Sequence, residues 1–241
     1  MIQSNECYVQ NKCKKYKEGT CTPNSVCQRL FKLDYLYNET NLSMSQRKHV
    51  DLRIDADGTD KEEFIKLSNV QNNIVEFVTK GYNLYIHSTT CGNGKSSWAI
   101  RMIQAYLNSI WPTCDFECKA LYINVPRYVL ALKDNISKAN EYVEHIKDNV
   151  NSADLVVWDE IGVKTLTQFE FDNLLQLINT RIDLGKSNIY TSNATPEEIK
   201  EKMGDRLYSR ICNGALDIEF HGQDKRSIFI GDSNGSVTGI K

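Results

Sequence analysis

Residues 83–96 read Asn83-Leu84-Tyr85-Ile86-His87-Ser88-Thr89-Thr90-Cys91-Gly92-Asn93-Gly94-Lys95-Ser96. The first five residues form a short apolar run typical of a buried strand, and residues 96–110 repeat apolar side chains at helical spacing. A loop that ends in Gly-Lys-Ser between a strand and a helix has the context of a Walker A phosphate loop. The sequence therefore predicts a loop whose backbone amides surround phosphate oxygens at the start of a helix.

The residue types within this loop suit nucleotide binding. The glycines let the backbone approach a ligand closely, Lys95 is placed to reach the β- and γ-phosphates of ATP, and the Ser96 hydroxyl is placed to ligate Mg²⁺. The Walker pattern expects glycine where this chain has Thr89, and a β-branched residue tolerates positive φ poorly, so we expect a different loop entrance there. On this motif alone, a glycine-rich turn at a helix start is the alternative. The predicted nucleotide-binding residues are Thr89, Thr90, Cys91, Gly92, Asn93, Gly94, Lys95, Ser96 and Ser97.

A second motif supports the first. The apolar run Leu155-Val156-Val157-Trp158 is followed by Asp159 and Glu160. An aspartate at the tip of a strand suits a Mg²⁺ contact, as in Walker B sites, and the adjacent glutamate is placed to polarise an attacking water. A solvated turn is the alternative for this motif alone. The two motifs together favour a site that binds ATP and Mg²⁺, with Glu160 as the catalytic base.

Further polar residues suit a hydrolytic site. The strand predicted at 188–191 ends in Ser192-Asn193, which places a neutral amide where a water or the γ-phosphate is sensed. Arg206 and Arg210 are four residues apart and share one face of a helix. An arginine supplied by a neighbouring subunit contributes roughly 10³–10⁵ in rate to phosphoryl transfer. The alternative for each arginine is a surface salt bridge of little energetic value.

Composition limits the classes of function. The chain has 241 residues, of which 41% are hydrophobic and 25% charged, which is enough for one medium domain and a small appendage. A formal net charge of −2 excludes a broadly basic nucleic-acid coat, so any DNA contact requires a local patch. No run approaches the roughly 20 apolar residues of a membrane span, and the first residues lack a signal-peptide layout. We therefore expect a cytoplasmic protein with no membrane partner.

Alternating patterns define the predicted fold class and domains. From Leu67 onward, strand-like runs alternate with helical periods, including one helix after Pro126 that carries Val129, Leu132, Ile136, Ala139, Val143 and Ile146 on one face. This alternation predicts an α/β fold with a mainly parallel sheet covered on both faces. We assign residues 67–241 to this domain, the charged stretch 51–66 to a linker, and residues 1–50 to a small N-terminal domain with a helix near 28–37.

Four motifs, in this order, resemble the DnaC/DnaI helicase-loader family of AAA+ ATPases: Trp158-Asp159-Glu160-Ile161-Gly162, Tyr190-Thr191-Ser192-Asn193, Gly204-Asp205-Arg206-Leu207-Tyr208-Ser209-Arg210 and Gly222-Gln223-Asp224-Lys225-Arg226. The likeness covers roughly residues 67–226 and is greatest to the bacteriophage-encoded and Gram-positive branch. It implies a P-loop core with a reduced or absent lid. It also implies that Asn193 is a sensor 1 residue, Arg210 an arginine finger that acts through self-association, and Arg226 a sensor-2-like residue that contacts the nucleotide.

The resemblance also implies partners. Members of the family bind a DnaB-type hexameric helicase through an N-terminal domain and deliver it to single-stranded DNA, and hydrolysis by an isolated subunit is expected to be slow. The IstB-type transposition ATPases share these motifs and are the closest alternative. An alternative from another class is an adaptor that binds nucleotide without hydrolysing it, with Thr89 as the sign of a decayed site.

The N-terminal cysteines distinguish these alternatives. Cys7, Cys13, Cys21 and Cys27 form a set that predicts a tetrahedral thiolate site for Zn²⁺, and a metal would help a segment with few large apolar residues to fold. The DnaI branch resembles this arrangement. The alternative is a set of unligated cysteines in a poorly ordered arm. Cys114 and Cys118 are interpreted as core or loop thiols.

Cations near the acidic strand end are candidates for contact with single-stranded DNA, which requires positive charge and aromatic rings along a groove. The alternative for these residues is a solvated helix face. The candidates are Arg127, Tyr128, Lys133 and Lys138 on the helix after Pro126, and Lys164 after the acidic motif.

Overall fold

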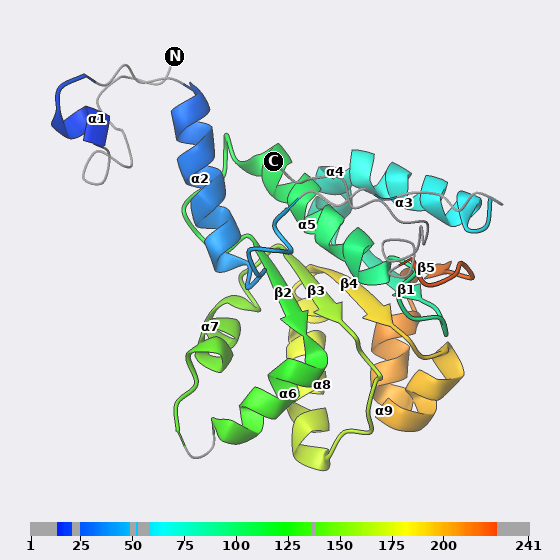
Figure 1. The fold of residues 1–241 in the computed structure, drawn as a ribbon. Helices are drawn as coiled ribbons and strands as arrows, with labels where there is room; N and C mark the ends of the chain where they lie inside the picture. Colours follow the sequence, from blue (N-terminus) through cyan, green and yellow to red (C-terminus); the bar gives the residue numbers. More distant parts are fainter. Residues whose placement is uncertain (1–13, 21–24, 49–51, 53–57, 136–137, 226–241) are drawn as a thin grey trace, which may run out of the picture.

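The computed structural model describes residues 14–20, 25–48, 52, 58–135 and 138–225. Within these residues the strands form one parallel sheet in the order β2-β3-β4-β1-β5, as Figure 1 shows. The α/β prediction of a parallel sheet is confirmed. The strands are β1 (Asn83–His87), β2 (Ala120–Asn124), β3 (Leu155–Asp159), β4 (Ser187–Ser192) and β5 (Ala215–Glu219).

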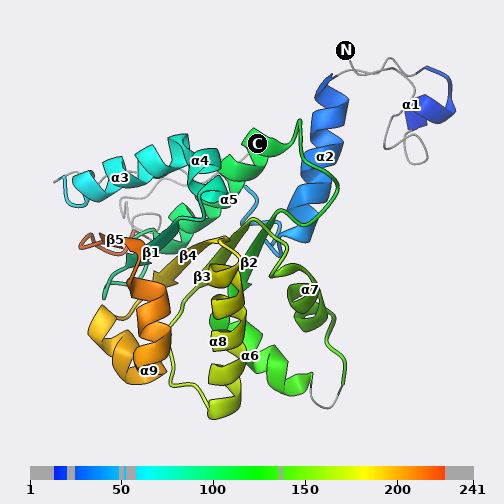
Figure 2. The ribbon, with the colours of Figure 1, turned by 180° about the vertical axis from the view of Figure 1, so that it is seen from behind.

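Helices cover both faces of the sheet (Figures 1 and 2). One face packs against α2 (Ser25–Glu39), α3 (Lys61–Asn72), α4 (Ile74–Thr79) and α5 (Lys95–Ile110). The other packs against α6 (Val125–Asp134), α7 (Glu141–Asn149), α8 (Gln168–Asp183) and α9 (Pro196–Cys212). A short helix, α1, spans Lys14–Lys17. No helix in the described part of the chain is both long enough and apolar enough to cross a membrane.

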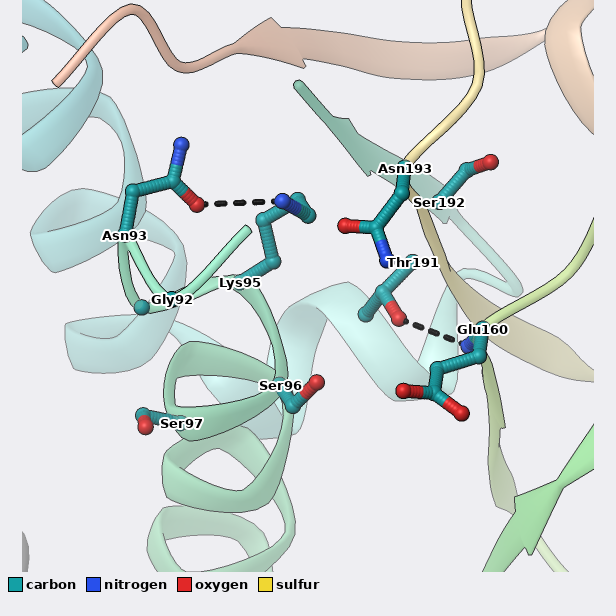
Figure 3. A pocket seen from close by; sticks show the side chains of 10 residues that line it. Gly92, Asn93, Lys95, Ser96, Ser97, Glu160, Thr191, Ser192 and Asn193 are labelled. Atoms are coloured by element: carbon teal, nitrogen blue, oxygen red, sulfur yellow. Dashed lines mark hydrogen bonds between the residues drawn. The ribbon is translucent and has the colours of Figure 1, made fainter. Parts of the chain in front are cut away.

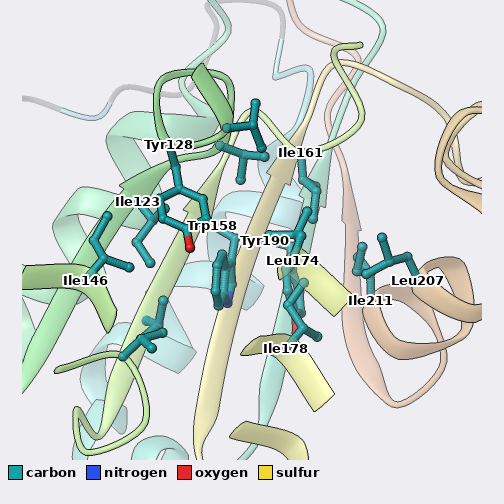
Figure 4. Packing of buried hydrophobic residues seen from close by; sticks show 14 of the residues in the cluster. Ile123, Tyr128, Ile146, Trp158, Ile161, Leu174, Ile178, Tyr190, Leu207 and Ile211 are labelled. Carbon is teal, nitrogen blue, oxygen red and sulfur yellow. The ribbon is translucent and has the colours of Figure 1, made fainter. Parts of the chain in front are cut away.

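Strand β3 shows why the apolar runs of this chain are continuous. Successive side chains of a strand point to opposite faces, and a strand covered on both faces needs apolar residues at every position. Val156 and Trp158 pack into the cluster beneath α6–α9, whereas Leu155 and Val157 pack into the cluster beneath α2–α5. Figure 4 shows Trp158 at the centre of the first cluster. The run therefore places Asp159, the next residue, at the edge of the core.

The predicted single helix after Pro126 is wrong, because the structure has two helices: α6 ends at Asp134 and α7 begins at Glu141. Ile136, which the prediction placed on the face of that helix, lies outside the described residues. Asn140 is the reason for the break. Its side chain accepts hydrogen bonds from the backbone N–H groups of Tyr142 and Val143 and caps α7, and its own N–H donates to the Asn135 side chain at 2.6 Å. Asparagine side chains compete with the helix for backbone groups in this way.

The N-terminal part of the described chain packs on the sheet. Helix α2 is longer than the helix expected near residues 28–37. Leu36 and Leu42 are buried in the same cluster as Leu67. Helix α3 begins at Lys61, within the stretch assigned to the linker, and Phe64 packs edge-on against Trp98 with ring centroids 5.0 Å apart. The division of the chain at residues 50 and 66 stays a prediction.

Arg181 on α8 is fully buried and joins the loops at the amino-terminal edge of the sheet. Its guanidinium donates to the Asn188 side chain and to four backbone carbonyls, those of Val150, Ala153, Asp154 and Ser187. Burial lowers the pKa of Arg181 to about 10, so the side chain still carries its charge at neutral pH.

We expect Arg181→Met to lower the free energy of unfolding by about 3 kcal/mol or more, because it leaves several buried carbonyls without a donor. Urea unfolding at pH 7 measures the change. Lys186→Met is the control: Lys186 pairs with Asp154 near the surface at 2.8 Å, and its loss is expected to cost less than about 1 kcal/mol. Equal unfolding midpoints for Arg181→Met and the wild type would contradict the prediction.

Candidate nucleotide-binding site

A pocket of about 210 Å³ lies at the carboxyl edge of the sheet, where the ends of β1, β3 and β4 meet. The carboxyl ends of parallel strands lie at one edge, and ligands of open α/β sheets bind there. In Figure 3, Lys95 and Ser96 face Thr191, Asn193 and Glu160 across this pocket. The structure thus brings both motifs together. The lining residues are Gly92, Asn93, Gly94, Lys95, Ser96, Ser97, Glu160, Thr191, Ser192 and Asn193.

The loop between β1 and α5 has the conformation of a phosphate cradle. Gly92 (φ 77°) and Gly94 (φ 107°) both adopt positive φ, which glycine permits without steric cost. Gly94 directly precedes α5, so the positive end of that helix faces the pocket. The Lys95 ammonium donates to the carbonyl of Thr90 at 2.7 Å and to the Asn93 side chain at 3.0 Å. These two bonds hold the Lys95 ammonium at the pocket.

The entrance of the loop accommodates Thr89. Among the described residues, the only non-glycine positions with positive φ are Asn41, Asp60 and Glu160. Thr89 is exposed and does not have a positive φ, so its β-branched side chain is not strained by a left-handed backbone. Thr89, Thr90 and Cys91 do not line the pocket, although Thr90 contributes the carbonyl that holds Lys95.

Asp159 is buried beside the pocket and is held by two hydroxyl groups. Tyr122 donates to Oδ2 at 2.5 Å and Thr191 donates to Oδ1 at 2.6 Å. Burial and the adjacent Asp159 charge raise the pKa of Tyr122, which keeps its hydroxyl a donor. These two residues come from β2 and β4, the strands on either side of β3. They fix the orientation of the carboxylate.

Glu160 has a left-handed backbone (φ 60°), which is unusual for a residue with a side chain and is concentrated at functional sites. Its N–H donates to the Thr191 hydroxyl at 3.1 Å, and its carboxylate accepts from the Asn124 side chain at 2.9 Å. Asn124 lies opposite Asp159 in the β2–β3 register. The strained backbone and these two bonds place the Glu160 carboxylate at the pocket.

Tyr122, Asn124 and Thr191 are site residues that the sequence analysis missed. Asn124 ends β2 and Thr191 is the last residue but one of β4, whereas Tyr122 lies in the middle of β2. The position near a strand end is the signal that could have revealed Asn124 and Thr191, since the edge of a parallel sheet is shared by neighbouring strands.

The predicted arginines lie away from the pocket of their own chain. Arg206 and Arg210 are exposed on the second half of α9, which is broken at Gly204 (φ 77°, ψ 162°). Neither lines the pocket, whereas Asn193 does. Arg226 lies outside the described residues.

The sequence predicts a magnesium site at the pocket and a zinc site at the N-terminal cysteines, and the structure describes the residues of the first but only one cysteine of the second. The Ser96 hydroxyl lines the pocket, and the Asp159 carboxylate is buried beside it. Both are hard oxygen donors of the kind that Mg²⁺ takes, so the chemistry of these residues fits this ion. Cys7, Cys13 and Cys21 lie outside the described residues, and Cys27 is exposed on α2. Across the ranges that the structure does describe, no cluster of three or more histidine, cysteine or acidic side chains could hold a metal ion. Cys118 is buried and Cys114 half-buried.

The candidate DNA residues have different environments. Tyr128 is buried in the core with 1% exposure, so its assignment to a DNA surface is wrong. Arg127 is exposed and stacks 4.3 Å from the centroid of the Tyr142 ring, and Lys138 is exposed. Lys133 and Lys164 both pair with Glu170, at 3.2 and 2.9 Å, which neutralises part of their charge.

Glu170 makes this cluster sensitive to acid. Burial raises its pKa, but hydrogen bonds from Thr167, Lys164 and Lys133 outweigh burial and lower the pKa to about 2. A lowered folded-state pKa stabilises the fold above the ordinary pKa, and that stability is lost as pH falls toward 2. We expect Glu170→Gln to destabilise the protein by about 1–2 kcal/mol at pH 7. The loss is limited to this size because Lys133 and Lys164 are half exposed, and water screens their charge. In urea unfolding, the difference from wild type should shrink below pH 4.5 and vanish near pH 2. A difference that is constant with pH would contradict this.

A phosphate loop after the first strand, an acid pair after the third and the strand order β2-β3-β4-β1-β5 together define a P-loop ATPase of the AAA+ type. The sequence agrees with this class. The chain belongs to the family of IstB-like ATP-binding proteins, whose profile matches residues 38–227. The family and the site identify an ATPase.

Individual relatives are involved in replication. The replicative helicase loader DnaC of Escherichia coli K12 is 28% identical over 94 residues, which is 39% of this chain and only 38% of the length of DnaC. Two crystal structures share the fold. A DnaC helicase loader has a TM-score of 0.56 at 14% identity, over 77% of this chain and 98% of that one. A putative primosome component from Streptococcus pyogenes serotype M3 has a TM-score of 0.57 at 20% identity, over 80% and 98%.

Proposed function

We propose that this ATPase is a loader that binds a DnaB-type hexameric helicase and delivers it to single-stranded DNA in replication. The match to DnaC carries the proposal, because it is a likeness of sequence as well as fold. The order of the four loader-like motifs along the chain supports it. A protein with this role acts on DNA, so we also place it in the cytoplasm.

The proposed reaction assigns roles to the loop residues, to the acid pair and to Asn193. Lys95 and the amides of the loop bind the triphosphate, and Ser97 lies beside them. Ser96 and Asp159 would hold Mg²⁺, which when bound neutralises charge on the phosphates. Glu160 accepts the proton of the attacking water. Asn193 contacts the γ-phosphate or this water, because its side chain faces the pocket from the end of β4.

Completion of the site requires a second subunit in this proposal. Arg210 is exposed and lies away from its own pocket, as an arginine that serves a neighbour must. Hydrolysis by an isolated subunit is therefore slow. Arg226 is proposed to contact the nucleotide as a sensor-2-like residue, on the strength of the motif that contains it.

The N-terminal domain is proposed to bind zinc and the helicase. The set Cys7, Cys13, Cys21 and Cys27 supports a thiolate site. Metal analysis of the purified full chain tests the assignment. The expected result is about one zinc per chain in the wild type and no zinc in Cys27→Ser. Wild-type protein that contains no zinc would contradict the zinc site.

Contact with single-stranded DNA is proposed for the cations on α6, for Lys138 between α6 and α7, and for the loop after β3. Arg127 and Lys138 are the stronger candidates, because Lys133 and Lys164 pair with Glu170, which neutralises part of their positive charge. Binding through phosphates weakens steeply with salt. A DNA affinity that is unchanged between low and moderate salt would contradict this interface.

The decisive experiment combines capture and turnover. Tagged protein is incubated with a purified hexameric replicative helicase, and ATP hydrolysis is followed with and without single-stranded DNA. Binding to the helicase in an ATP-dependent manner, together with turnover stimulated by DNA, is the expected result. Stimulation by DNA without any helicase binding would favour the IstB-type transposition ATPase, the alternative that shares these motifs. No turnover under any condition would favour an adaptor.

A further inference from the structure

A segment after β5 runs from the sheet to the phosphate loop, and we refer to Phe220–Lys225 as the strap. The Phe220 N–H donates to the His87 carbonyl at 2.8 Å and extends the pairing of β5 with β1, while its ring is buried. At the other end, the Lys225 N–H donates to the Gly92 carbonyl at 3.1 Å. Asp224 lies so close to Gly92 that a Cβ atom there would collide with its carboxylate.

Asp60 holds the middle of the strap, although it is 161 and 162 residues from its partners. Its Oδ1 accepts from the His221 N–H at 2.7 Å, and its Oδ2 accepts from the Gly222 N–H at 2.8 Å. Figures 1 and 2 both place the start of α3, the end of β5 and the start of α5 at one corner of the molecule. Bonds to an ionised acceptor are roughly twice as strong as neutral ones.

The Asp60 carboxylate does not cap the helix that follows it. Asp60 directly precedes α3, where aspartate ordinarily caps the helix that follows. Here it makes no side-chain bond to α3, and its backbone is left-handed (φ 62°). Local helix capping therefore does not explain the residue. The bonds to the strap are the contacts that the structure gives its carboxylate.

The strap contacts the phosphate loop from outside the pocket. Gly92 lines the pocket, whereas Asp224 and Lys225 do not. A loop with two glycines at positive φ has much conformational freedom to lose when it closes around phosphates. Contacts that order the loop beforehand reduce this cost and strengthen ligand binding.

We propose that Asp60 is a positioning residue for the nucleotide site, which it supports by holding the strap against Gly92. The inference rests on the function proposed for the pocket. It predicts an effect on nucleotide affinity and little effect on the chemical step, because Asp60 touches neither the lining residues nor Glu160.

The test uses the full chain and two measurements. Hydrogen exchange reports the amides of His221 and Gly222, and titration with a fluorescent ADP reports nucleotide affinity. For Asp60→Ala we expect faster exchange at both amides and a Kd raised about tenfold, the value of a hydrogen bond to a charged group. The turnover at saturating ATP should stay within about twofold of wild type.

Two further variants make the test specific. Asp60→Asn keeps the shape and one acceptor oxygen, so it should give intermediate exchange and affinity, and it replaces Asp60→Ala if that variant does not fold. Glu62→Ala removes the same charge from an exposed residue two positions away and should change neither measurement.

Three results would overturn the inference or locate the failure elsewhere. Unchanged exchange in Asp60→Ala would show that Asp60 does not hold the strap. Faster exchange with an unchanged Kd would show that the strap does not support the loop. A wild-type protein that binds no nucleotide would refute the function of the pocket instead, which the exchange measurement distinguishes because it needs no ligand.

Discussion

Glu160→Gln is expected to slow ATP hydrolysis by about 10²–10⁴-fold while nucleotide affinity stays within about twofold of wild type. Glutamine has the shape of glutamate but cannot accept the proton of the attacking water. Its amide oxygen can still accept the bond from Asn124, so the side chain keeps its position at the pocket. Phosphate release at saturating ATP and titration with a fluorescent ADP measure the two quantities separately.

Glu141→Gln is the matched control, because Glu141 is exposed on α7 and does not line the pocket. This variant should hydrolyse ATP like the wild type. If Glu160→Gln also hydrolyses ATP at the wild-type rate, Glu160 is not the base. If wild type and Glu160→Gln are equally inactive, even with single-stranded DNA and helicase present, the chain is a nucleotide-binding adaptor.

The sheet and the centre of the site could be predicted from the sequence because their signals are local. The strands at Asn83–His87 and Ala120–Asn124 coincide with apolar runs bounded by polar residues. Lys95 and Glu160 then follow from rules that tie ligands to the carboxyl ends of such strands. A run of five residues carries enough information for this, since buried parallel strands tolerate few other patterns.

Contacts between distant segments could not be predicted. Tyr122 and Thr191 reach Asp159 only through the strand order β2-β3-β4, which no single motif encodes. Asp60 reads as part of a charged linker, but it binds backbone groups far along the chain. Arg181 reads as a polar position on an amphipathic helix, and only the packed structure shows that it is buried among carbonyls. In each case a polar side chain forms a hydrogen bond with a residue that is far away in the sequence.

Arg210→Ala is expected to reduce turnover by about 10³–10⁵-fold under conditions in which the protein assembles, with nucleotide affinity unchanged. The charge that develops on the transferred phosphoryl group needs a cation in addition to Lys95. Among the described residues that line the pocket, no second cation is present. Arg206→Ala is the control, because Arg206 is exposed one turn earlier on α9 and presents the same type of side chain. Turnover per subunit should rise with protein concentration for wild type and for Arg206→Ala.

Mixing two inactive variants tests whether Arg210 acts between subunits. Lys95→Ala cannot hold the triphosphate but still presents Arg210, whereas Arg210→Ala has an intact pocket but lacks the arginine. A mixture contains junctions in which the intact pocket of one variant faces the intact arginine of the other, so part of the turnover should return. An arginine that acted within its own chain would leave every mixture inactive, because no single chain would then contain both groups. Wild-type turnover by Arg210→Ala alone would show that the arginine has no part in hydrolysis.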